Sequence, residues 1–446
     1  MPLARRASTR ITALGITALL LAVVPAVPAV GLSPTACRVT NTTTGKVVRS
    51  LPTAVAKAKK GQTLEMRGVC TGPVTIARDL TIRGVRPAGA AVPTIDGAAG
   101  GSTIVVTDDV TLRLFRLTVT GGTGTSILGV LMGGGMRVLG RAELTKVTVT
   151  GNSADNGGGI ALEGAELILT GSTISANSAT DLGGGIHANQ AEIELRGASR
   201  VTANSADAAG GIYAGPASLS LAGTARVDTN TAVEKGGGIL LGGGSFLQMS
   251  QSTKVDGNVV SASDGAGGGI HSEGATIILA GAAVVTGNRA AYSGGGVSLA
   301  GGSLTMRGTS AVRANDADGT APKGNGGGVH AIGVGATVVL EDAARIELND
   351  AADAGGGVLI VYGPSLTLSG TAAIAQNTAG GSGGGIYANG ATNGATIDLR
   401  GSATITGNSA GSTGGGVYAW QSTLFLTCTS GATAAIFGNT PDQCAP

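Results

Sequence analysis

Aromatic and charged side chains are scarce in this chain of 446 residues, of which 2% are aromatic and 13% are charged. Ordinary globular domains carry about a quarter charged residues, so this composition is untypical of one. The hydrophobic content of 42% nevertheless excludes an intrinsically disordered chain, because disordered chains lack the apolar surface that offsets chain entropy. The sequence therefore predicts a folded protein of unusual architecture.

Long hydrophobic runs are missing after the first thirty residues. Three arginines precede an uncharged apolar run over residues 11–24, and small residues follow the run at 27–29. This order predicts a signal peptide over residues 1–29. The run is shorter than the roughly 20 apolar residues that span a bilayer. We therefore expect secretion or cell-surface localisation, with no transmembrane segment in the mature chain.

An excess of charge of either sign is missing as well. Removal of the leader would leave 26 basic side chains against 27 acidic ones. This balance gives no basic surface of the kind that binds nucleic acid, so no nucleic-acid partner is expected. The oligomeric state stays open.

Cysteine is rare, and its four positions lie in pairs near the two ends of the chain. Cys37 and Cys70 form one pair, and Cys428 and Cys444 form the other. In an exported protein this usage predicts disulfides. Four cysteines allow three connectivities, and we expect Cys37–Cys70 and Cys428–Cys444.

Glycine, in contrast, is abundant, with 80 residues. Eleven times a glycine cluster precedes an apolar residue, at Met136, Ile160, Ile186, Ile212, Ile239, Ile270, Val297, Val329, Val358, Ile386 and Val417. The steps of 24 to 32 residues predict a solenoid built of similar units. Its glycines would serve turn geometry and close packing of coils.

Each unit shows two further patterns. A strand such as 191–195 alternates apolar and polar side chains, with the period of two that is typical of a half-buried strand. An aliphatic-x-x-Asn motif then ends the unit, with its asparagine at 152, 177, 204, 230, 258, 288, 315, 349, 377, 408 and 439. Asparagine tolerates left-handed turn geometry, and stacked amides can hydrogen-bond between coils, so we expect an asparagine ladder.

Three strands and three turns in each unit predict an all-β fold, a right-handed parallel β-helix of about 13 coils. Residues 30–49 would form an N-terminal segment, and residues 50–132 a short capping helix over 50–60 with entry coils. Residues 133–446 would hold the glycine-rich repeats and a C-terminal cap. In that cap we expect Trp420, Phe425 and Phe437 to plug the end of the core.

The paired motifs resemble the repeats of the polymorphic outer-membrane protein family, in which Gly-Gly-Ala-Ile alternates with Phe-x-x-Asn. The likeness covers roughly residues 133 to 439, with Ile or Val here in place of the Phe. Residues 68–74 and 80–84 are similar to entry coils of the wider pectin-lyase-like β-helix superfamily. The resemblance implies secretion and surface adhesion, with a polysaccharide or a host or neighbouring cell surface as partner.

The residue after each apolar position of the glycine motif is the candidate for ligand binding, because it should point outward. This position, the outward stripe, holds all three histidines and three of the five tyrosines: His187, Tyr213, His271, His330, Tyr387 and Tyr418. Such side chains can contact sugar rings. The alternative is that β-favouring side chains simply cover the strand backbone. The histidines are not on neighbouring coils, so no metal or other cofactor is expected.

Two other functions remain open. A polysaccharide lyase or glycoside hydrolase would need clustered carboxylates, and Asp155, Asp181 and Asp207 are the best such cluster, in turns rich in small residues. A purely structural spacer needs no site at all. The intervals 258–267 and 315–326 are longer than their counterparts, and insertions of this kind often decorate a binding face.

Substitution of one inward-facing position tests the predicted columns. Leu221→Asp should unfold several coils together, because each coil is stabilised by its neighbours and a buried carboxylate is costly. Thermal unfolding followed by circular dichroism would measure this effect. A melting curve like that of the unsubstituted protein would show that the column is wrongly assigned.

Overall fold

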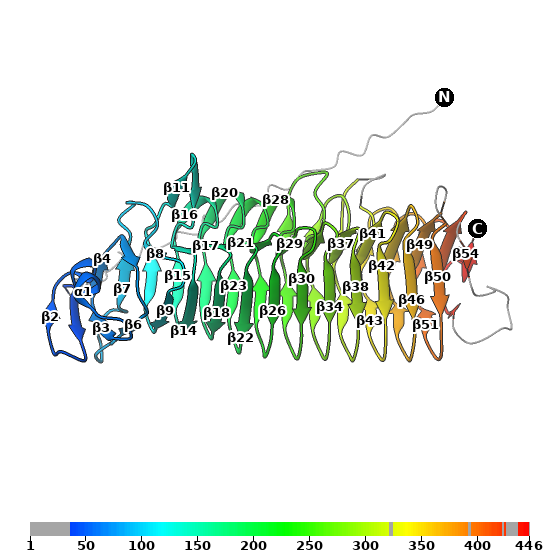
Figure 1. Cartoon of the computed structure of the whole chain (residues 1–446). Helices are drawn as coiled ribbons and strands as arrows, with labels where there is room; N and C mark the ends of the chain where they lie inside the picture. Colours follow the sequence, from blue (N-terminus) through cyan, green and yellow to red (C-terminus); the bar gives the residue numbers. More distant parts are fainter. Residues whose placement is uncertain (1–35, 321–323, 391–393, 422, 425–435, 446) are drawn as a thin grey trace, which may run out of the picture.

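The computed structural model describes residues 36–445 except 321–323, 391–393, 422 and 425–435. These residues form a parallel β-solenoid of about 13 turns (Figure 1). Four sheets of 14, 16, 14 and 12 strands run along the rod, and we number them I to IV in the order in which a coil visits them. All pairings between described strands are parallel except β1–β2, β1–β3 and β11–β12.

Sheet I contains the strands that follow the glycine clusters. They are β5 (Val74–Ile76), β8 (Ile104–Val106), β13 (Met136–Val138), β17 (Ile160–Glu163), β21 (Ile186–Asn189), β25 (Ile212–Ala214), β29 (Ile239–Leu241), β33 (Ile270–Ser272), β37 (Val297–Ala300), β41 (Val329–Ile332), β45 (Val358–Val361), β49 (Ile386–Asn389), β53 (Val417–Trp420) and β56 (Cys444–Ala445).

Sheet II contains the alternating strands. They are β2 (Val47–Val48), β1 (Arg38–Asn41), β3 (Thr63–Arg67), β6 (Leu80–Gly84), β9 (Thr111–Phe115), β14 (Arg141–Thr145), β18 (Glu166–Thr170), β22 (Glu192–Arg196), β26 (Ser218–Leu221), β30 (Phe246–Met249), β34 (Thr276–Leu279), β38 (Ser303–Met306), β42 (Thr337–Leu340), β46 (Ser365–Leu368), β50 (Thr396–Leu399) and β54 (Thr423–Leu424).

Sheet III contains the strands that lead to the ladder asparagines. They are β4 (Val69–Thr71), β7 (Thr94–Asp96), β10 (Thr118–Thr120), β15 (Thr148–Thr150), β19 (Thr173–Ser175), β23 (Arg200–Thr202), β27 (Arg226–Asp228), β31 (Lys254–Asp256), β35 (Val284–Thr286), β39 (Ala311–Arg313), β43 (Arg345–Glu347), β47 (Ala373–Ala375), β51 (Thr404–Thr406) and β55 (Ile436–Phe437).

Sheet IV contains the strands between each asparagine and the next glycine cluster. They are β11 (Thr125–Ile127), β12 (Val130–Met132), β16 (Ser153–Asn156), β20 (Ser178–Leu182), β24 (Ser205–Ala208), β28 (Thr231–Lys235), β32 (Val259–Val260), β36 (Arg289–Ala290), β40 (Asp316–Ala317), β44 (Asp350–Ala351), β48 (Thr378–Ala379) and β52 (Ser409–Ala410).

Sheet IV corrects the prediction of three strands per unit, because most repeats have four. Its strands are rich in Ser, Ala and Asp, and their inward column consists of small residues such as Ala232, Val260 and Ala290, two positions after each ladder asparagine. Alanine is depleted in strands, so this column is a weak sequence signal for a sheet. The aliphatic columns of the other three sheets are confirmed. In sheet II, for example, Leu167, Ile193 and Leu219 are paired in register and fully buried.

The asparagine ladder is confirmed along its whole length. Asn177 represents it: its Oδ1 accepts hydrogen bonds from the backbone N and the Nδ2 of Asn152, at 3.1 and 2.9 Å. Its own Nδ2 donates to Asn204 Oδ1 and to the Val149 carbonyl, both at 3.0 Å. Each amide therefore joins three successive coils, and every one of the eleven asparagines is buried.

Left-handed geometry falls one residue earlier than expected. The eleven asparagines do not adopt it, and the residue before each of them does. Those residues are Gly151, Ala176, Ala203, Thr229, Gly257, Gly287, Ala314, Leu348, Gln376, Gly407 and Gly438. A positive φ is costly for a β-branched residue such as Thr229, whose φ is 53°. The hydrogen bonds of the adjacent amide must therefore hold this corner in place.

The glycine clusters pack directly on the ladder. A Cβ on Gly184, the middle glycine of one cluster, would lie 2.3 Å from the Ser205 carbonyl oxygen. A Cβ on Gly185 would lie 3.0 Å from Nδ2 of Asn204, which ends the same repeat, and 2.7 Å from the Gly211 carbonyl oxygen in the next coil. These approaches leave no room for a side chain, which confirms that glycine serves close packing of coils.

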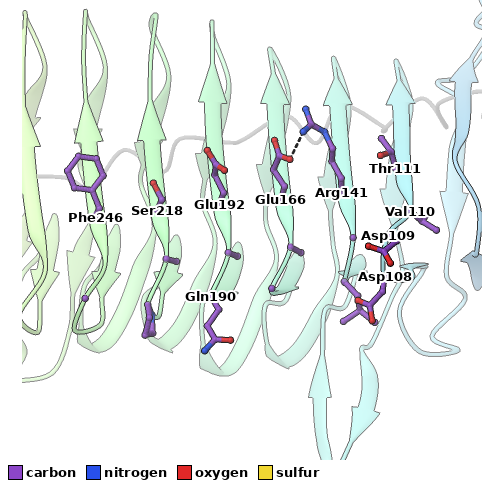
Figure 2. A pocket seen from close by; sticks show the side chains of 18 residues that line it. Asp108, Asp109, Val110, Thr111, Arg141, Glu166, Gln190, Glu192, Ser218 and Phe246 are labelled. Atoms are coloured by element: carbon purple, nitrogen blue, oxygen red, sulfur yellow. Dashed lines mark hydrogen bonds and ion pairs between the residues drawn. The ribbon is translucent and has the colours of Figure 1, made fainter.

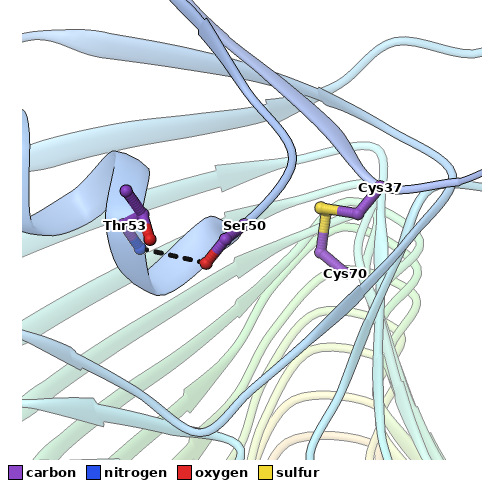
Figure 3. Close-up of a disulfide and its surroundings, with 4 residues drawn as sticks. All are labelled: Cys37, Ser50, Thr53 and Cys70. Carbon is purple, nitrogen blue, oxygen red and sulfur yellow. Dashed lines mark hydrogen bonds between the residues drawn. A yellow bond between two sulfur atoms is a disulfide. The ribbon is translucent and has the colours of Figure 1, made fainter.

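The N-terminal end combines a helix, entry strands and a disulfide. Helix α1 (Leu51–Lys57) begins after Ser50, whose Oγ accepts a hydrogen bond from the Thr53 backbone N at 3.2 Å (Figure 3). The disulfide Cys37–Cys70 is confirmed, with its Cα atoms 4.7 Å apart. That α1 caps the core stays a prediction. The expected signal peptide at 1–29 lies outside the described residues.

The C-terminal end differs from the expected plug. Trp420 is 46% exposed and follows the buried positions of β53 on the outer face of sheet I, so it does not fill the core. Phe437 is also exposed, and Phe425 lies outside the described residues. Cys444 is disulfide-bonded, but Cys428 is not described, so their pairing stays a prediction.

Gln443 ends the ladder. Its Oε1 accepts hydrogen bonds from Nδ2 and the backbone N of Asn439, at 2.9 and 3.2 Å. Its Nε2 donates to the Asn439 carbonyl oxygen at 3.1 Å. A side chain four residues away thus occupies the place of the next asparagine.

Removal of one ladder amide should destabilise the solenoid strongly. Asn288→Ala leaves the backbone N and Nδ2 of Asn258 without their buried acceptor. At roughly 1–3 kcal/mol for each orphaned group, the free energy of unfolding should fall by about 2–6 kcal/mol. Urea unfolding would measure the loss, with Asn189→Ala, at an exposed position outside the ladder, as control. Equal effects of both substitutions would contradict the role of the ladder.

Candidate functional site

The outward stripe forms one continuous row along sheet I. Register pairs its members strand by strand: Ala161, His187, Tyr213, Leu240, His271, Ser298, His330, Leu359, Tyr387 and Tyr418. The strand positions before and after each member point into the core, so the stripe lies on the outer face. This alignment is as the repeat spacing indicates.

The histidines of the stripe are nevertheless buried. His187, His271 and His330 are 8%, 8% and 7% exposed. Burial lowers the pKa of each to about 4, so all three imidazoles are neutral near pH 7. In the described part of the chain, Nδ1 of each has no hydrogen-bond partner. The histidines therefore lie on the outer face of sheet I, as predicted, but are covered there.

Neighbouring rings of the stripe stack on one another. The ring centroids of His187 and Tyr213 are 4.9 Å apart, and those of Tyr387 and Tyr418 are 5.0 Å apart. The interplanar angles are 22° and 24°. Each paired ring therefore covers one face of its neighbour. Such a pair presents its ring edges and its tyrosine hydroxyl groups outward.

A change in sheet IV divides the stripe into two parts. Strands β16 to β28 have four or five residues, whereas β32 to β52 have two. Where sheet IV is long, Tyr213 and Leu240 pack against Leu182, Ala208 and Ala209. Where it is short, longer loops lead to sheet I, and the outer face opens into a cavity beside the last four members of the row. The structure thus separates His187 and Tyr213, which follow long sheet IV strands, from His330, Tyr387 and Tyr418, which line the cavity. His271 follows a short strand but is not among the lining residues.

The open part forms a cavity of about 640 Å³, the tyrosine cleft. Its floor is the stripe itself, at His330, Leu359, Tyr387 and Tyr418. The cleft crosses five successive coils, about 19 Å at the roughly 4.8 Å spacing of strands.

The walls of the cleft come from the two corners beside sheet I. Residues that precede the glycine clusters line one wall: Tyr292, Ser293, Asn325, Asp353, Ser382 and Ser412. Residues at or after the ends of sheet I strands line the other: Ile332, Val361, Tyr362 and Asn389. Four of the five tyrosines of the chain therefore meet in one cavity.

Tyr292 and Tyr362, which are 41% and 46% exposed, are not among the residues predicted from the sequence. Both lie in corners outside the repeated columns, so periodicity does not select them. The length of the interval 315–326 was a sequence signal for this face, because the interval contributes Asn325 to the cleft. Trp420 also belongs to this face, since it pairs in register with Asn389.

A second, larger groove of about 1130 Å³ runs over the corner between sheets I and II, from β9 to β30 (Figure 2). Its labelled side chains include Asp108, Asp109, Glu166 and Glu192. The cation among its lining residues, Arg141, pairs with Glu143 and Glu166. Among the described residues no group of three potential metal ligands occurs here or elsewhere.

The carboxylates considered for catalysis were expected in turns. They lie instead in the strands of sheet IV. Asp155 and Asp181 lie within β16 and β20, and Asp207 lies within β24. Asp155 accepts hydrogen bonds from the Leu131 backbone N at 2.8 Å and from Thr180 Oγ1 at 2.7 Å. These bonds lower its pKa. Asp155 in β16 therefore holds the β11–β12 hairpin to sheet IV through a hydrogen bond.

Comparison with protein-family models, curated proteins and solved structures finds no match for this chain. Among the described residues, no helix has the length and apolar character to cross a bilayer.

The buried histidines should make the solenoid sensitive to acid. Their folded-state pKa of about 4 lies below the unfolded value of 6.5, so between these pH values the unfolded chain binds protons that the folded chain does not. Stability should fall as the pH drops from 6.5 towards 4, by about 1.4 kcal/mol per pH unit for each histidine.

Urea unfolding at pH 7.5, 6 and 5 would measure this slope. The variant His187→Leu/His271→Leu/His330→Leu is the comparison, because Leu240 and Leu359 already occupy the same row. Its slope should be shallower by the contribution of the three imidazoles. An unchanged slope would show that carboxylates alone cause the acid sensitivity.

Proposed function

We propose that this is an exported protein that acts at the cell surface or outside the cell, in adhesion or glycan binding, and that the tyrosine cleft holds the glycan. The observation that carries the proposal is the convergence of Tyr292, Tyr362, Tyr387 and Tyr418 on one cavity in a chain with 2% aromatic residues. Ligand sites are typically concave and combine aromatic walls with a few polar groups.

The chemistry of the cleft suits a sugar chain. Tyr292 and Tyr362 are partly exposed in its walls, where their rings can contact the apolar faces of sugar rings. Hydroxyl and amide groups of serine and asparagine line the same walls and match sugar hydroxyls. The buried Nδ1 of His330 adds one further polar group in the floor.

Several parts of this proposal rest on the sequence. The signal peptide at 1–29 motivates export, and the Cys37–Cys70 disulfide is compatible with an oxidising compartment. The proposal of adhesion is motivated by the resemblance to polymorphic outer-membrane protein repeats. The same resemblance suggests a right-handed β-helix of the pectin-lyase-like type. The capping role of α1 belongs to the same proposal.

A polysaccharide-cleaving enzyme is the second candidate, favoured by the resemblance alone. Glycoside hydrolysis normally uses two carboxylates about 5–9.5 Å apart, and calcium-dependent elimination needs an acidic cluster. The described lining of the tyrosine cleft contains one carboxylate, that of Asp353. This composition supports binding rather than cleavage in the cleft.

Binding of the purified mature protein to immobilised plant, bacterial and animal polysaccharides tests the proposal. At least one glycan should retain the protein, and Tyr292→Ala/Tyr362→Ala should weaken that binding by about tenfold or more, the equivalent of ~1.4 kcal/mol. Tyr213→Leu is the control, because Tyr213 packs under sheet IV and Leu240 is its neighbour in the row.

New reducing or unsaturated chain ends in the same assay would favour the enzyme. No retention and no cleavage would leave a structural spacer or protein adhesion. Equal loss of binding in the control variant would show that the cleft is not the site.

A further inference from the structure

The described lining of the tyrosine cleft carries one charged side chain, that of Asp353. Neither lysine nor arginine is among these lining residues, and His330 is buried without a hydrogen-bond partner for Nδ1. Asp353 lies close enough to the floor that its charge contributes, after burial and Tyr418, to raising the pKa of Tyr387. The cleft therefore offers a carboxylate and no described cation.

Sheet IV carries further carboxylates on the same coils, outside the lining of the cleft. Asp316 and Asp350 are paired in register on β40 and β44, the coils that also supply Asn325 and Asp353. Burial, Asp318 and Asp350 together raise the pKa of Asp316. The nearby cation Arg289 is engaged in an ion pair with Asp318. Clefts lined by charge of one sign concentrate the field of that sign.

We infer that the tyrosine cleft takes an uncharged sugar chain and rejects the acidic chain of the same backbone. This inference deepens the proposed function and rests on it. Proteins that bind carboxylates use arginine or lysine, since an unpaired carboxylate that leaves water is costly. A polyuronate would place a carboxylate at every sugar residue along the cleft, and one of these would lie against Asp353.

The second groove does not provide an alternative for acidic chains. Its cation Arg141 is neutralised by Glu143 and Glu166, and Asp108, Asp109 and Glu192 add further negative charge (Figure 2). The tyrosine cleft and the second groove therefore both disfavour an anionic ligand, unlike a separate cavity of about 520 Å³ near the N-terminal end, whose lining includes Arg83, Arg86, Arg116 and Lys146.

Pairs of glycans that share a backbone and differ in charge at C6 test the inference. One pair is cellohexaose and cellohexaose oxidised to the carboxylate at C6. The other is polygalacturonate and its fully methyl-esterified form. Calorimetry or biolayer interferometry at low salt should show that the neutral member of a bound pair binds at least about tenfold more tightly.

Two interventions should reduce the ratio of the affinities for the neutral and the acidic glycan without weakening the binding of the neutral glycan. Asp353→Asn removes the carboxylate of the cleft, and 0.5 M NaCl screens charge at the cleft mouth. Asp108→Asn is the control, because it removes the same charge at an exposed position of the second groove. In that variant the ratio should stay as in the unsubstituted protein.

The outcomes separate this inference from the function on which it rests. Equal or tighter binding of the acidic members would overturn the inference and leave glycan binding in place. If Asp353→Asn and Asp108→Asn change the affinity ratio equally, selectivity comes from the net charge of the protein. This result would also overturn the inference. If neither the pairs nor the wider glycan panel binds, both the proposed function and the inference fail.

Discussion

The hydrogen bond from one ladder asparagine to the next is the interaction on which the rest of the structure depends. The amide of Asn204 accepts from the preceding coil and lies 3.0 Å from the position that a Cβ on Gly185 would occupy. The two repeated motifs, separate in the sequence, are therefore two sides of one contact. The amide satisfies buried backbone groups at the corner, and the missing glycine side chain lets the coils approach closely enough for the amide to do so.

This contact also bears on where the surface of the solenoid can vary. Sheets I, II and III need large inward side chains for the core, and the corners after sheet III are fixed by the ladder. Sheet IV needs only a column of small inward side chains such as Ala232, Val260 and Ala290, and the loops that follow it carry neither constraint. Their length can change from β28 to β32 without disturbing the stack, and this change opens the outer face of sheet I as the tyrosine cleft.

Sequence patterns predicted the repeats that glycine, asparagine and large aliphatic side chains mark. The glycine clusters, the aliphatic columns and the ladder follow from a period that the backbone imposes. Sheet IV escaped prediction because its inward column is mostly alanine, as at Ala232 and Ala290, and alanine is a weak signal for a strand. The burial of His330 and the approach of Tyr292 to Tyr387 depend on how sheet IV and its loops cover sheet I, which no local pattern records.

The amide of Gln443 at the end of the ladder has a consequence for how the row of amides ends. Each asparagine of the ladder bonds to the next, so the last one would be left with unpaired donors. Unpaired donors at the end of a stack can bind a coil of a second molecule. Gln443 occupies the terminal acceptor position with a side chain from its own chain. The last asparagine thus finds both of its acceptor contacts within its own chain, so the row of amides closes intramolecularly.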